Sequence, residues 1–463
     1  MEPRSLKYVA ESCGGELRRG SPAATITRVC TDSRQARPGD LFIALVGEKF
    51  DGHNYLAEAA RKGVAAVVGE KKKLEGQAPD CALIAVENTR QALGELAARY
   101  RRDFALPVIA VGGSNGKTTT KELIAAVLGQ RFTALGSQAS FNNDIGVPIT
   151  LLSLDRTHEV AVLEVGTNHP GELAPLVRMS GPKYGVITSI GREHLEFFGD
   201  LNGAAEEEGW LAELLPAEGT LFVNGDSPEM EKILRRTPAK VTRVGFGPGN
   251  DWRAVGVGPD ETGVTFHVET ANGALDGEYR VNLLGRHQVV NALLAAAVGK
   301  ELGMIREEIH RGLAECRGPK MRLQMWTANG VRVLDDAYNA NVDSMLAALE
   351  TLRDYPCAGR RVAVLGDMAE LGLRSAEAHA EVGRRAAESK VDQLFAVGKM
   401  AGVMGAAARA AGLMRVIELG EVETVANAVK HFVRTGDVVL VKASRASRLE
   451  RVSETLRGDE PQP

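Results

Sequence analysis

Residues 108–120 read VIAVGGSNGKTTT, and this stretch decides the fold. The apolar run predicts a buried strand, the glycines predict a tight turn, and Lys117 opens a helix to about residue 130. In a strand–turn–helix unit, backbone N–H groups and the helix N-terminus face phosphate oxygens. The lysine adds positive charge at the β- and γ-phosphates, and the hydroxyl of Thr118 is a possible Mg²⁺ ligand. The stretch therefore predicts a nucleotide site, of the shorter GxxGKT type because Val111 stands where the full motif has glycine.

The loop residues expected to bind this nucleotide follow the strand directly. They are Gly113, Ser114, Asn115, Gly116, Lys117, Thr118 and Thr119.

The pattern around this unit indicates an α/β domain over residues 106–317. Residues 158–166 (HEVAVLEVG) and 183–191 (KYGVITSIG) are nearly continuous apolar runs, as in a parallel sheet covered on both faces. A long helix is expected over residues 286–303. We interpret the region as a P-loop-type ATP-binding domain with a parallel sheet.

The flanking regions predict two more α/β domains. Residues 1–105 combine turn formers, short apolar runs and helical stretches, as in a small α/β unit. Residues 318–463 alternate five strand-like runs with helices, which implies a Rossmann-like doubly wound parallel sheet. A length of 463 residues suits about three domains at roughly 150 residues each.

Composition excludes several classes of protein. With 44% hydrophobic and 25% charged residues the chain is a globular one, and its net charge of −4 gives no electrostatic case for a nucleic-acid partner. The five cysteines are widely spaced without a CxxC pair, which favours a reducing cytoplasm over disulfides or zinc. No apolar run approaches the ~18 residues of a membrane helix, so we expect no membrane insertion. We expect a cytoplasmic monomer.

Two further residues at strand ends are candidate metal ligands. Glu164 closes an apolar run, where a carboxylate is costly unless it is paired or used, and beside a phosphate loop it would hold Mg²⁺. His194 follows another strand and is a candidate ligand as well. The alternatives are a solvated glutamate and a structural histidine. Thr118, Glu164 and His194 are thus the predicted metal site, with Lys117 as the principal catalytic cation.

Several motifs together resemble one family, the Mur ligases, which are ATP-dependent amide-forming enzymes of peptidoglycan synthesis. The matching motifs cover most of the chain in order: TDSR (31–34), PGDLFIAL (38–45), FDGH (50–53), GSNGKTTTKE (113–122), SFNNDIGVP (140–148), LEVGTNHPGEL (163–173), HLEFFG (194–199), GRHQVVNALLAA (285–296), DDAYNAN (335–341), LGDMAELG (365–372) and VKASR (441–445). The resemblance implies three domains, of which the first binds the UDP part of the substrate.

The resemblance also implies roles for individual residues. His287 and Asn291 would meet the adenine of ATP, and Arg322 and Asp336 would complete the nucleotide site. The residues expected to contact substrate are Ser33, Arg34, Asp51, His53, Asn142, Asn143, Tyr338, Asn339, Asn341, Lys442 and Arg445.

The implied reaction has two steps and uses ATP and Mg²⁺. The carboxylate of UDP-N-acetylmuramoyl-tripeptide attacks the γ-phosphate of ATP to give an acyl phosphate and ADP, and the amine of D-alanyl-D-alanine then displaces phosphate. Two anions must meet, so Lys117 and Mg²⁺ must neutralise charge. The acyl phosphate hydrolyses easily, so we expect the domains to close and exclude water.

One departure from the family pattern concerns the catalytic set. Where the family has a carbamylated lysine that bridges Mg²⁺, this chain has Glu208, and Trp210 replaces the glutamate that usually follows. Glu208 supplies a permanent anion on a shorter arm, so it reaches the metal directly, through water, or not at all. Alternatively, residues 206–208 are a solvated helix face. Two smaller departures are Val342 for a usual proline and Ala443 for a usual glycine.

Other functions remain open at this point. Another amide ligase of the same superfamily would add a diamino acid to the dipeptide substrate or glutamate to folate. LGDMAELG stands where the diamino-acid enzyme has a DNPR-type motif, which favours the D-alanyl-D-alanine branch. A non-catalytic nucleotide-binding regulator is a third hypothesis, against which the intact Lys117, Thr118, Glu164 and His194 argue.

Overall fold

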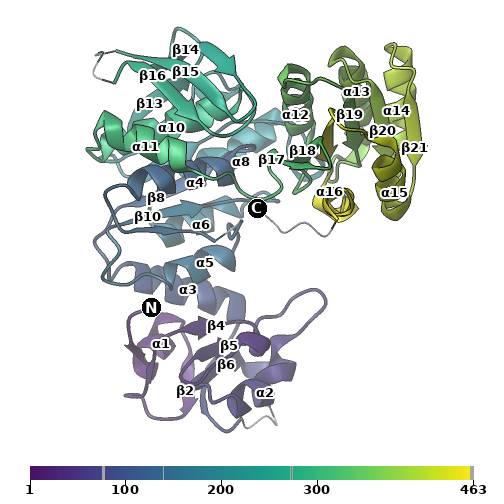
Figure 1. Ribbon diagram of the computed structural model, residues 1–463. Helices are drawn as coiled ribbons and strands as arrows, with labels where there is room; N and C mark the ends of the chain where they lie inside the picture. The colour runs from purple at the N-terminus through teal and green to yellow at the C-terminus, as the bar shows by residue number, and fades with distance from the viewer. Residues whose placement is uncertain (76–78, 139, 272, 274, 459–463) are drawn as a thin grey trace.

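The computed structural model describes residues 1–75, 79–138, 140–271, 273 and 275–458. It has three α/β lobes in chain order, and the C-terminal lobe (green to yellow) lies beside the central one (Figure 1). The predicted α/β class is confirmed. Among the described residues, no helix has the length and apolar character needed to cross a membrane.

The N-terminal lobe is built on a small, mostly parallel sheet. Its elements are β1 (Arg4–Ser5), α1 (Leu6–Ser12), β2 (Glu16–Arg19), β3 (Thr25–Ile26), β4 (Val29–Cys30), η1 (Ser33–Gln35), β5 (Leu41–Ile43), η2 (Gly52–Tyr55), α2 (Leu56–Arg61), β6 (Ala66–Glu70), η3 (Lys71–Lys73), β7 (Ala82–Val86) and α3 (Thr89–Arg101). The strand order is β2-β7-β6-β5-β4, with only β2 antiparallel, and β1 pairs with β3 separately.

The central lobe holds the largest sheet, of nine strands. Its elements are β8 (Val108–Gly112), α4 (Lys117–Leu128), β9 (Ala134–Gly136), α5 (Gly146–Leu151), β10 (Val160–Glu164), α6 (Leu173–Ser180), β11 (Tyr184–Ile187), α7 (Leu195–Phe198), α8 (Leu201–Glu213), β12 (Thr220–Asn224), α9 (Met230–Leu234), β13 (Lys240–Gly245), β14 (Trp252–Pro259), β15 (Val264–Thr270), β16 (Gly277–Val281), α10 (Gln288–Glu301) and α11 (Arg306–Glu315). The order is β16-β15-β14-β13-β12-β11-β8-β10-β9.

The strand order in this sheet places the site. β8 lies between β10 and β11, all parallel, so their carboxyl ends meet at one edge. The chain leaves β8 toward β9 on one side and returns to β11 on the other, which makes this edge a topological switch point where ligands bind.

The central sheet also contains strands that the sequence analysis did not anticipate. β14, β15 and β16 are an antiparallel extension with one face in the core and one toward solvent. The alternation in Val264–Thr270, where Val264, Phe266 and Val268 are buried, is the period-two pattern of such a strand. The expected parallel sheet therefore carries an antiparallel extension at one edge.

The C-terminal lobe is the expected doubly wound sheet with one added edge. Its elements are β17 (Gln324–Ala328), β18 (Val331–Asp336), α12 (Val342–Asp354), β19 (Arg361–Leu365), η4 (Gly372–Arg374), α13 (Ser375–Glu388), β20 (Gln393–Val397), α14 (Ala401–Ala410), β21 (Val416–Leu419), α15 (Val422–Phe432), β22 (Val438–Lys442), η5 (Arg445–Ser447) and α16 (Glu450–Arg457). The order is β17-β18-β22-β19-β20-β21, and only β17 is antiparallel. Asn329 and Gly330, both at positive φ, form the tight β17–β18 turn.

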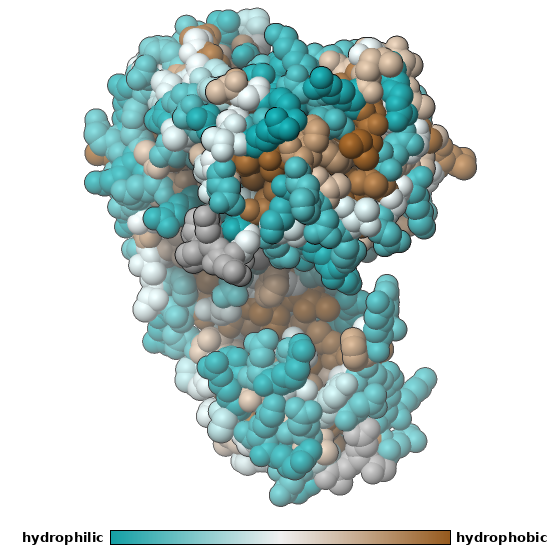
Figure 2. Space-filling model, turned by 45° about the vertical axis from the view of Figure 1, so that its right-hand side comes forward, coloured by the Kyte–Doolittle hydropathy of each residue, from teal (hydrophilic) through white to brown (hydrophobic). Residues whose placement is uncertain are grey.

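The packing between lobes differs on the two sides of the central sheet. α3 packs against α5 and α6, and one apolar cluster runs from Leu6 in the first lobe to Ala239 in the second. The N-terminal and central lobes therefore share a core. In Figure 2 the surface is hollowed above the N-terminal lobe at the bottom of the view, and brown, apolar residues gather in this hollow. Leu195 of α7 packs into the apolar core of the C-terminal lobe.

Candidate active site

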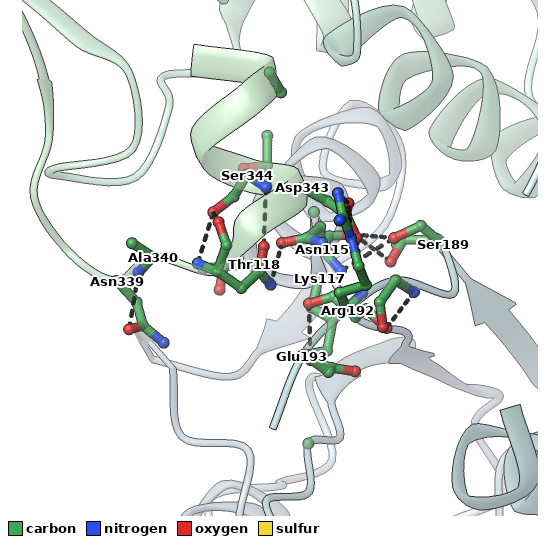
Figure 3. A pocket seen from close by; sticks show the side chains of 18 of the residues that line it. Asn115, Lys117, Thr118, Ser189, Arg192, Glu193, Asn339, Ala340, Asp343 and Ser344 are labelled. Atoms are coloured by element: carbon green, nitrogen blue, oxygen red, sulfur yellow. Dashed lines mark hydrogen bonds and ion pairs between the residues drawn. The ribbon is translucent and has the colours of Figure 1, made fainter. Parts of the chain in front are cut away.

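A cavity of about 890 Å³ lies between the central and C-terminal lobes. It is lined by loops after β8, β10 and β11, by residues after β12 and β13, and by the ends of β18 and β22, so strand ends from two sheets meet there. Figure 3 shows part of this lining. The predicted site residues that line it are Ser114, Asn115, Gly116, Lys117, Thr118, Thr119, Asn142, Asn143, Glu164, His194, His287, Asn291, Arg322, Asp336, Tyr338, Asn339, Asn341 and Lys442.

The phosphate loop is held in a conformation that requires glycine. Gly113 and Gly116 have φ of +108° and +87°. A Cβ atom on Gly113 would lie 2.5 Å from Thr188 Oγ1, and one on Gly116 would lie 2.7 Å from Asn291 Oδ1. Both glycines are therefore needed for positive φ and for close approach. The Ser114 N–H also donates to the Ser189 carbonyl at 2.8 Å, which fastens the loop to the end of β11.

Lys117 is surrounded by acceptors. Its Nζ donates to the carbonyl of Gly113, to that of Ser114 at 3.3 Å, and to Glu193 Oε2 at 3.3 Å. Burial disfavours its charge, but the carboxylates of Glu193, Glu208 and Glu164 outweigh burial and raise the pKa of Lys117. The ammonium group is thus held in its charged form, which electrostatic work on a phosphate requires.

Three buried carboxylates near Lys117 each keep one oxygen without a hydrogen-bond partner in the described structure. These atoms are Glu164 Oε2, Glu193 Oε1 and Glu208 Oε1. Glu164 uses its other oxygen to accept from Asn142 Nδ2 at 2.8 Å. Lys117 balances a single ionised carboxylate, so ionisation of a second one leaves an excess of negative charge, which suits a cation.

The described part of the chain holds no group of three or more His, Cys, Asp or Glu side chains arranged to bind a metal on their own. Mg²⁺ is usually held by one or two carboxylates together with phosphate oxygens and water, so the side chains present fit a nucleotide-bound Mg²⁺. Glu164 has a free oxygen for it. Thr118 is buried beside Ser140, with 3.5 Å between the two hydroxyl oxygens.

His194 adopts a left-handed conformation at the start of α7, with φ of +45°. Its Nδ1 is paired with the carboxylate of Glu370, which belongs to the C-terminal lobe. With Nδ1 paired in this way, Nε2 is the ring nitrogen that could bind a metal. The role of His194 as a metal ligand stays a prediction.

The acidic run at residues 206–208 is not a solvated helix face, which removes that alternative. Glu207 and Glu208 are 4% and 1% exposed, whereas Glu206 lies on the surface. Glu208 does not line the cavity; its Oε2 accepts the N–H of Gly113 at 2.7 Å from behind the phosphate loop. Burial raises the pKa of Glu208 to about 8, against the opposing effect of Lys117.

The start of α10 forms one wall of the cavity near the phosphate loop. Asn291 is buried, and its amide is held by Thr120 Oγ1 at 3.1 Å and Gln288 Oε1 at 2.8 Å. The neighbouring His287 is partly buried, and burial lowers its pKa, so its ring is neutral near pH 7.

The C-terminal lobe contributes an ion pair at two adjacent strand ends. Asp336 of β18 and Lys442 of β22 are register partners, and their side chains meet with 2.6 Å between Oδ2 and Nζ. Lys442 also donates to the Asn339 carbonyl at 3.0 Å, and burial lowers its pKa. Arg322 lies over the ring of Tyr338, 4.4 Å from its centroid.

Polar pairs join the two lobes across the cavity, and the sequence analysis missed most of them. Arg192 pairs with Asp343 at 2.7 Å (Figure 3). It also pairs with Glu381 at 2.8 Å. Asn341 Nδ2 donates to Asn115 Oδ1 at 2.9 Å. Arg192 and Glu193 directly precede the predicted His194 in the loop after β11. This position next to a predicted site residue is the feature of the sequence that could have indicated them.

Five predicted substrate residues lie outside this cavity. Arg445 is exposed and pairs with Glu450 at 3.3 Å. Ser33, Arg34, Asp51 and His53 belong to the N-terminal lobe.

Within that lobe, the predicted residues differ in whether their polar atoms already have partners in the protein. Both ring nitrogens of His53 are used: Nδ1 meets Asp51 Oδ1 at 2.6 Å and Nε2 accepts the N–H of Glu70 at 2.8 Å. The geometry therefore gives His53 a structural task. Arg34 is exposed and pairs with its neighbour Asp32 at 2.8 Å. Substrate contact by these residues stays a prediction.

A phosphate loop at a parallel-sheet switch point, facing a second sheet across a cavity, defines a nucleotide-using enzyme that works between two domains. Family models match the same three regions: the Mur ligase family catalytic domain at residues 25–101, the Mur ligase middle domain at 111–299 and the Mur ligase glutamate ligase domain at 321–445. The chain belongs to the Mur ligase family.

Similar proteins cover the chain from end to end. The UDP-N-acetylmuramoyl-tripeptide–D-alanyl-D-alanine ligase of Bacillus subtilis is 35% identical over 98% of this chain and 99% of its own. Among solved structures, MurF from Acinetobacter baumannii has a TM-score of 0.89 at 31% identity, covering 99% of each chain. MurF from Thermotoga maritima, solved with ADP, has a TM-score of 0.82 at 28% identity over 93% of this chain and 97% of that one.

Proposed function

We propose that this protein joins D-alanyl-D-alanine to UDP-N-acetylmuramoyl-tripeptide at the expense of ATP, in the synthesis of peptidoglycan precursors. The relatives that match the whole chain carry this activity in their names. The observation that carries the proposal is a cavity lined by both the phosphate loop and the strand ends of the C-terminal lobe. A ligase of this kind must bring a triphosphate, a carboxylate and an amine together, and a cavity between domains suits that task.

The first step transfers the γ-phosphoryl group to the carboxylate of the tripeptide. A carboxylate oxygen bonds to the γ-phosphorus as the bond to the β–γ bridging oxygen breaks, and ADP leaves. Lys117 and the N–H groups at the start of α4 neutralise charge on the phosphates, since phosphoryl transfer depends on positioning and electrostatics. Thr118 and Glu164, with His194 and Glu193 adjacent, would hold Mg²⁺, which supplies further charge neutralisation on the phosphate oxygens.

The second step forms the amide bond. The amine of D-alanyl-D-alanine attacks the acyl carbon, phosphate leaves, and the amine loses a proton. The acyl phosphate is open to hydrolysis, so the C-terminal lobe has the task of excluding water. We assign amine-substrate and phosphate contacts to Lys442, Tyr338, Asn339 and Asn341 on that lobe. The UDP part of the substrate we assign to the N-terminal lobe near Ser33, Arg34 and Asp51.

Release of ADP tests the proposal. Purified protein is given ATP, Mg²⁺ and UDP-N-acetylmuramoyl-tripeptide, with and without D-alanyl-D-alanine, and ADP is followed with a coupled assay. We expect sustained ADP release only when both substrates are present, with an amide product of the combined mass.

Matched substrates provide the control. The corresponding dipeptide substrate with a diamino acid should give no product. Turnover with that pair, but not with the tripeptide and D-alanyl-D-alanine, would assign the chain to the diamino-acid-adding branch instead.

A further inference from the structure

Two neighbouring carboxylates on α8 bind the backbones of two different loops of the active site. Glu208 Oε2 accepts the N–H of Gly113 at 2.7 Å. Glu207 Oε2 accepts the N–H of Gly171 and its Oε1 accepts the N–H of Leu173, both at 2.8 Å. One turn of one helix therefore fastens the loop after β8 and the loop after β10.

These loops carry the two groups on which the nucleotide site depends. The loop after β8 leads to Lys117, and the loop after β10 begins directly beyond Glu164. The two strands are hydrogen-bonded neighbours, with Glu164 opposite Val111. The distance between the ammonium of Lys117 and the carboxylate of Glu164 thus depends on how the two loops are set relative to each other.

The packing of α8 against the phosphate loop leaves no room for a side chain at Gly112. A Cβ atom on Gly112 would lie 2.9 Å from Glu208 Oε2, so only glycine allows the carboxylate to reach the next N–H. At Gly171 and Leu173, Glu207 satisfies donors at the start of α6 that would otherwise lack partners.

Electrostatics alone argues against placing these anions here. A carboxylate behind a loop that must receive a triphosphate repels the ligand, and its burial carries a desolvation cost. Hydrogen bonding to the loop backbone is a compensating role, and the exposed Glu206 on the same helix has no such bond to either loop.

We propose that Glu207 and Glu208 are positioning residues that align the two loops of the nucleotide site through backbone hydrogen bonds, with α8 as the rigid connection. The assignment builds on the nucleotide site of the proposed function but concerns residues that line no part of the cavity wall formed by Lys117 and Glu164.

Amide hydrogen exchange tests the positioning directly in the full-length protein without ligand. We expect Glu208→Ala to speed exchange in the peptide covering residues 108–118 and to leave residues 166–174 unchanged. Glu207→Ala should do the reverse, and Glu206→Ala should change neither. If either variant accelerates both segments equally, or neither segment, the assignment of one loop to each carboxylate is wrong.

Nucleotide affinity supplies the functional measurement. We expect Glu208→Ala to weaken ADP binding, measured by calorimetry, about tenfold, as the loss of one hydrogen bond at a buried loop implies. Glu208→Gln keeps an acceptor oxygen of the same reach, so its ADP affinity should lie within about threefold of the wild type. Because glutamine has the same size as glutamate, this variant leaves no cavity in the folded protein. Glu206→Ala is the matched control.

Two results would overturn the positioning role. Wild-type affinity in Glu208→Ala means that the bond to Gly113 does not matter for the site. Glu208→Gln binding as weakly as Glu208→Ala means that the negative charge acts, not the hydrogen bond. A wild-type protein that binds no ADP would contradict the proposed function instead, while the exchange experiment would still decide the question of the loops.

Discussion

At the scale of single residues, the site is governed by charge balance around Lys117. One ammonium group faces Glu164, Glu193 and Glu208, and each of these buried carboxylates has an oxygen without a partner in the described structure. Ionisation of more than one of these carboxyl groups requires a further cation, because an uncompensated buried charge costs several kcal/mol; burial raises the pKa of Glu208 accordingly. Lys117 thus contributes both to the chemistry and to the stability of the buried carboxyl groups around it.

We predict that Lys117→Ala abolishes turnover while the fold persists. The variant removes the cation at the β- and γ-phosphates, and loss of one electrostatic donor of this kind costs about 10³ in rate. The measurement is kcat for ADP release, with a thermal melt to verify folding. Lys183→Ala is the control, since Lys183 is an exposed lysine beside β11 and far from the strand ends of the site. Turnover near that of the wild type in Lys117→Ala would contradict the nucleotide site.

A second residue-scale prediction concerns Asp335, the buried residue before Asp336. Burial raises the pKa of Asp335 to about 6, above its usual value near 4. Between these two pH values the native state binds more protons than the unfolded state, so the free energy of unfolding falls as pH rises from about 4 to 6 and stays lower above that range.

Replacing this carboxyl by an amide removes the titration. We predict that the melting temperature of Asp335→Asn exceeds that of the wild type by a margin that grows as pH rises from about 4.5 to 7. The corresponding difference in the free energy of unfolding should reach up to about 3 kcal/mol. Melting temperatures across that range are the measurement. A difference between the two proteins that does not change with pH would show that Asp335 titrates normally.

At the scale of elements, α3 (Thr89–Arg101) decides how the first lobe attaches. Asn88 caps its N-terminus, and its apolar face packs against α5 and α6 of the next lobe. Tyr100 at its end donates from its hydroxyl to the Leu154 carbonyl at 2.7 Å and accepts the N–H of Glu2 at 2.6 Å. The helix therefore belongs to two lobes at once, although the expected boundary follows it at residue 105.

We predict that Tyr100→Phe destabilises the protein by about 1–2 kcal/mol, because the buried Leu154 carbonyl loses its donor. ADP affinity should stay unchanged, since no residue of α3 lines the cavity. Chemical denaturation of the variant and the wild type gives the free energy, and calorimetry gives the affinity. If the ADP affinity dropped together with stability, the first lobe would be coupled to the nucleotide site more strongly than this packing implies.

At the scale of the whole molecule, the C-terminal lobe is joined to the central one largely by polar pairs. Arg192 holds both Asp343 and Glu381, and His194 holds Glu370. The connecting segment contains Met321 and Leu323 at positive φ, an unfavourable conformation for large side chains. Polar contacts and a strained connection suit a lobe that moves, while the shared apolar core keeps the first two lobes together.

We predict that Arg192→Ala opens the molecule. Loss of both ion pairs should raise the radius of gyration measured by small-angle scattering, and an ATP analogue with UDP-N-acetylmuramoyl-tripeptide should then compact the variant more than the wild type. Arg353→Ala is the control, because the ion pairs of Arg353 join it to Glu350 and Asp354 of its own helix, α12. Identical profiles for the variant and the wild type, with and without ligands, would mean that the Arg192 pairs do not hold the lobes.

The sequence by itself determined the parts of this protein that depend on local order along the chain. The strand–turn–helix at residues 108–120 predicted the phosphate loop, because glycine at positive φ and lysine at a helix start are local requirements. Alternation of apolar runs and helices predicted the α/β class and the doubly wound C-terminal sheet, which the structure confirms. Most of the residues that the motifs indicated for the site line the cavity.

Only the tertiary structure decided the features that depend on packing between distant segments. Residues 206–208 read as three equal acids, yet one is exposed and two are buried against separate loops, because the orientation of α8 selects which side faces the sheet. Likewise, Arg192 meets Asp343 and Glu381 only because the lobes are folded together, across more than a hundred residues of chain. A side chain's partner across such a distance is set by the relative placement of whole elements, and no periodicity within one element encodes that placement.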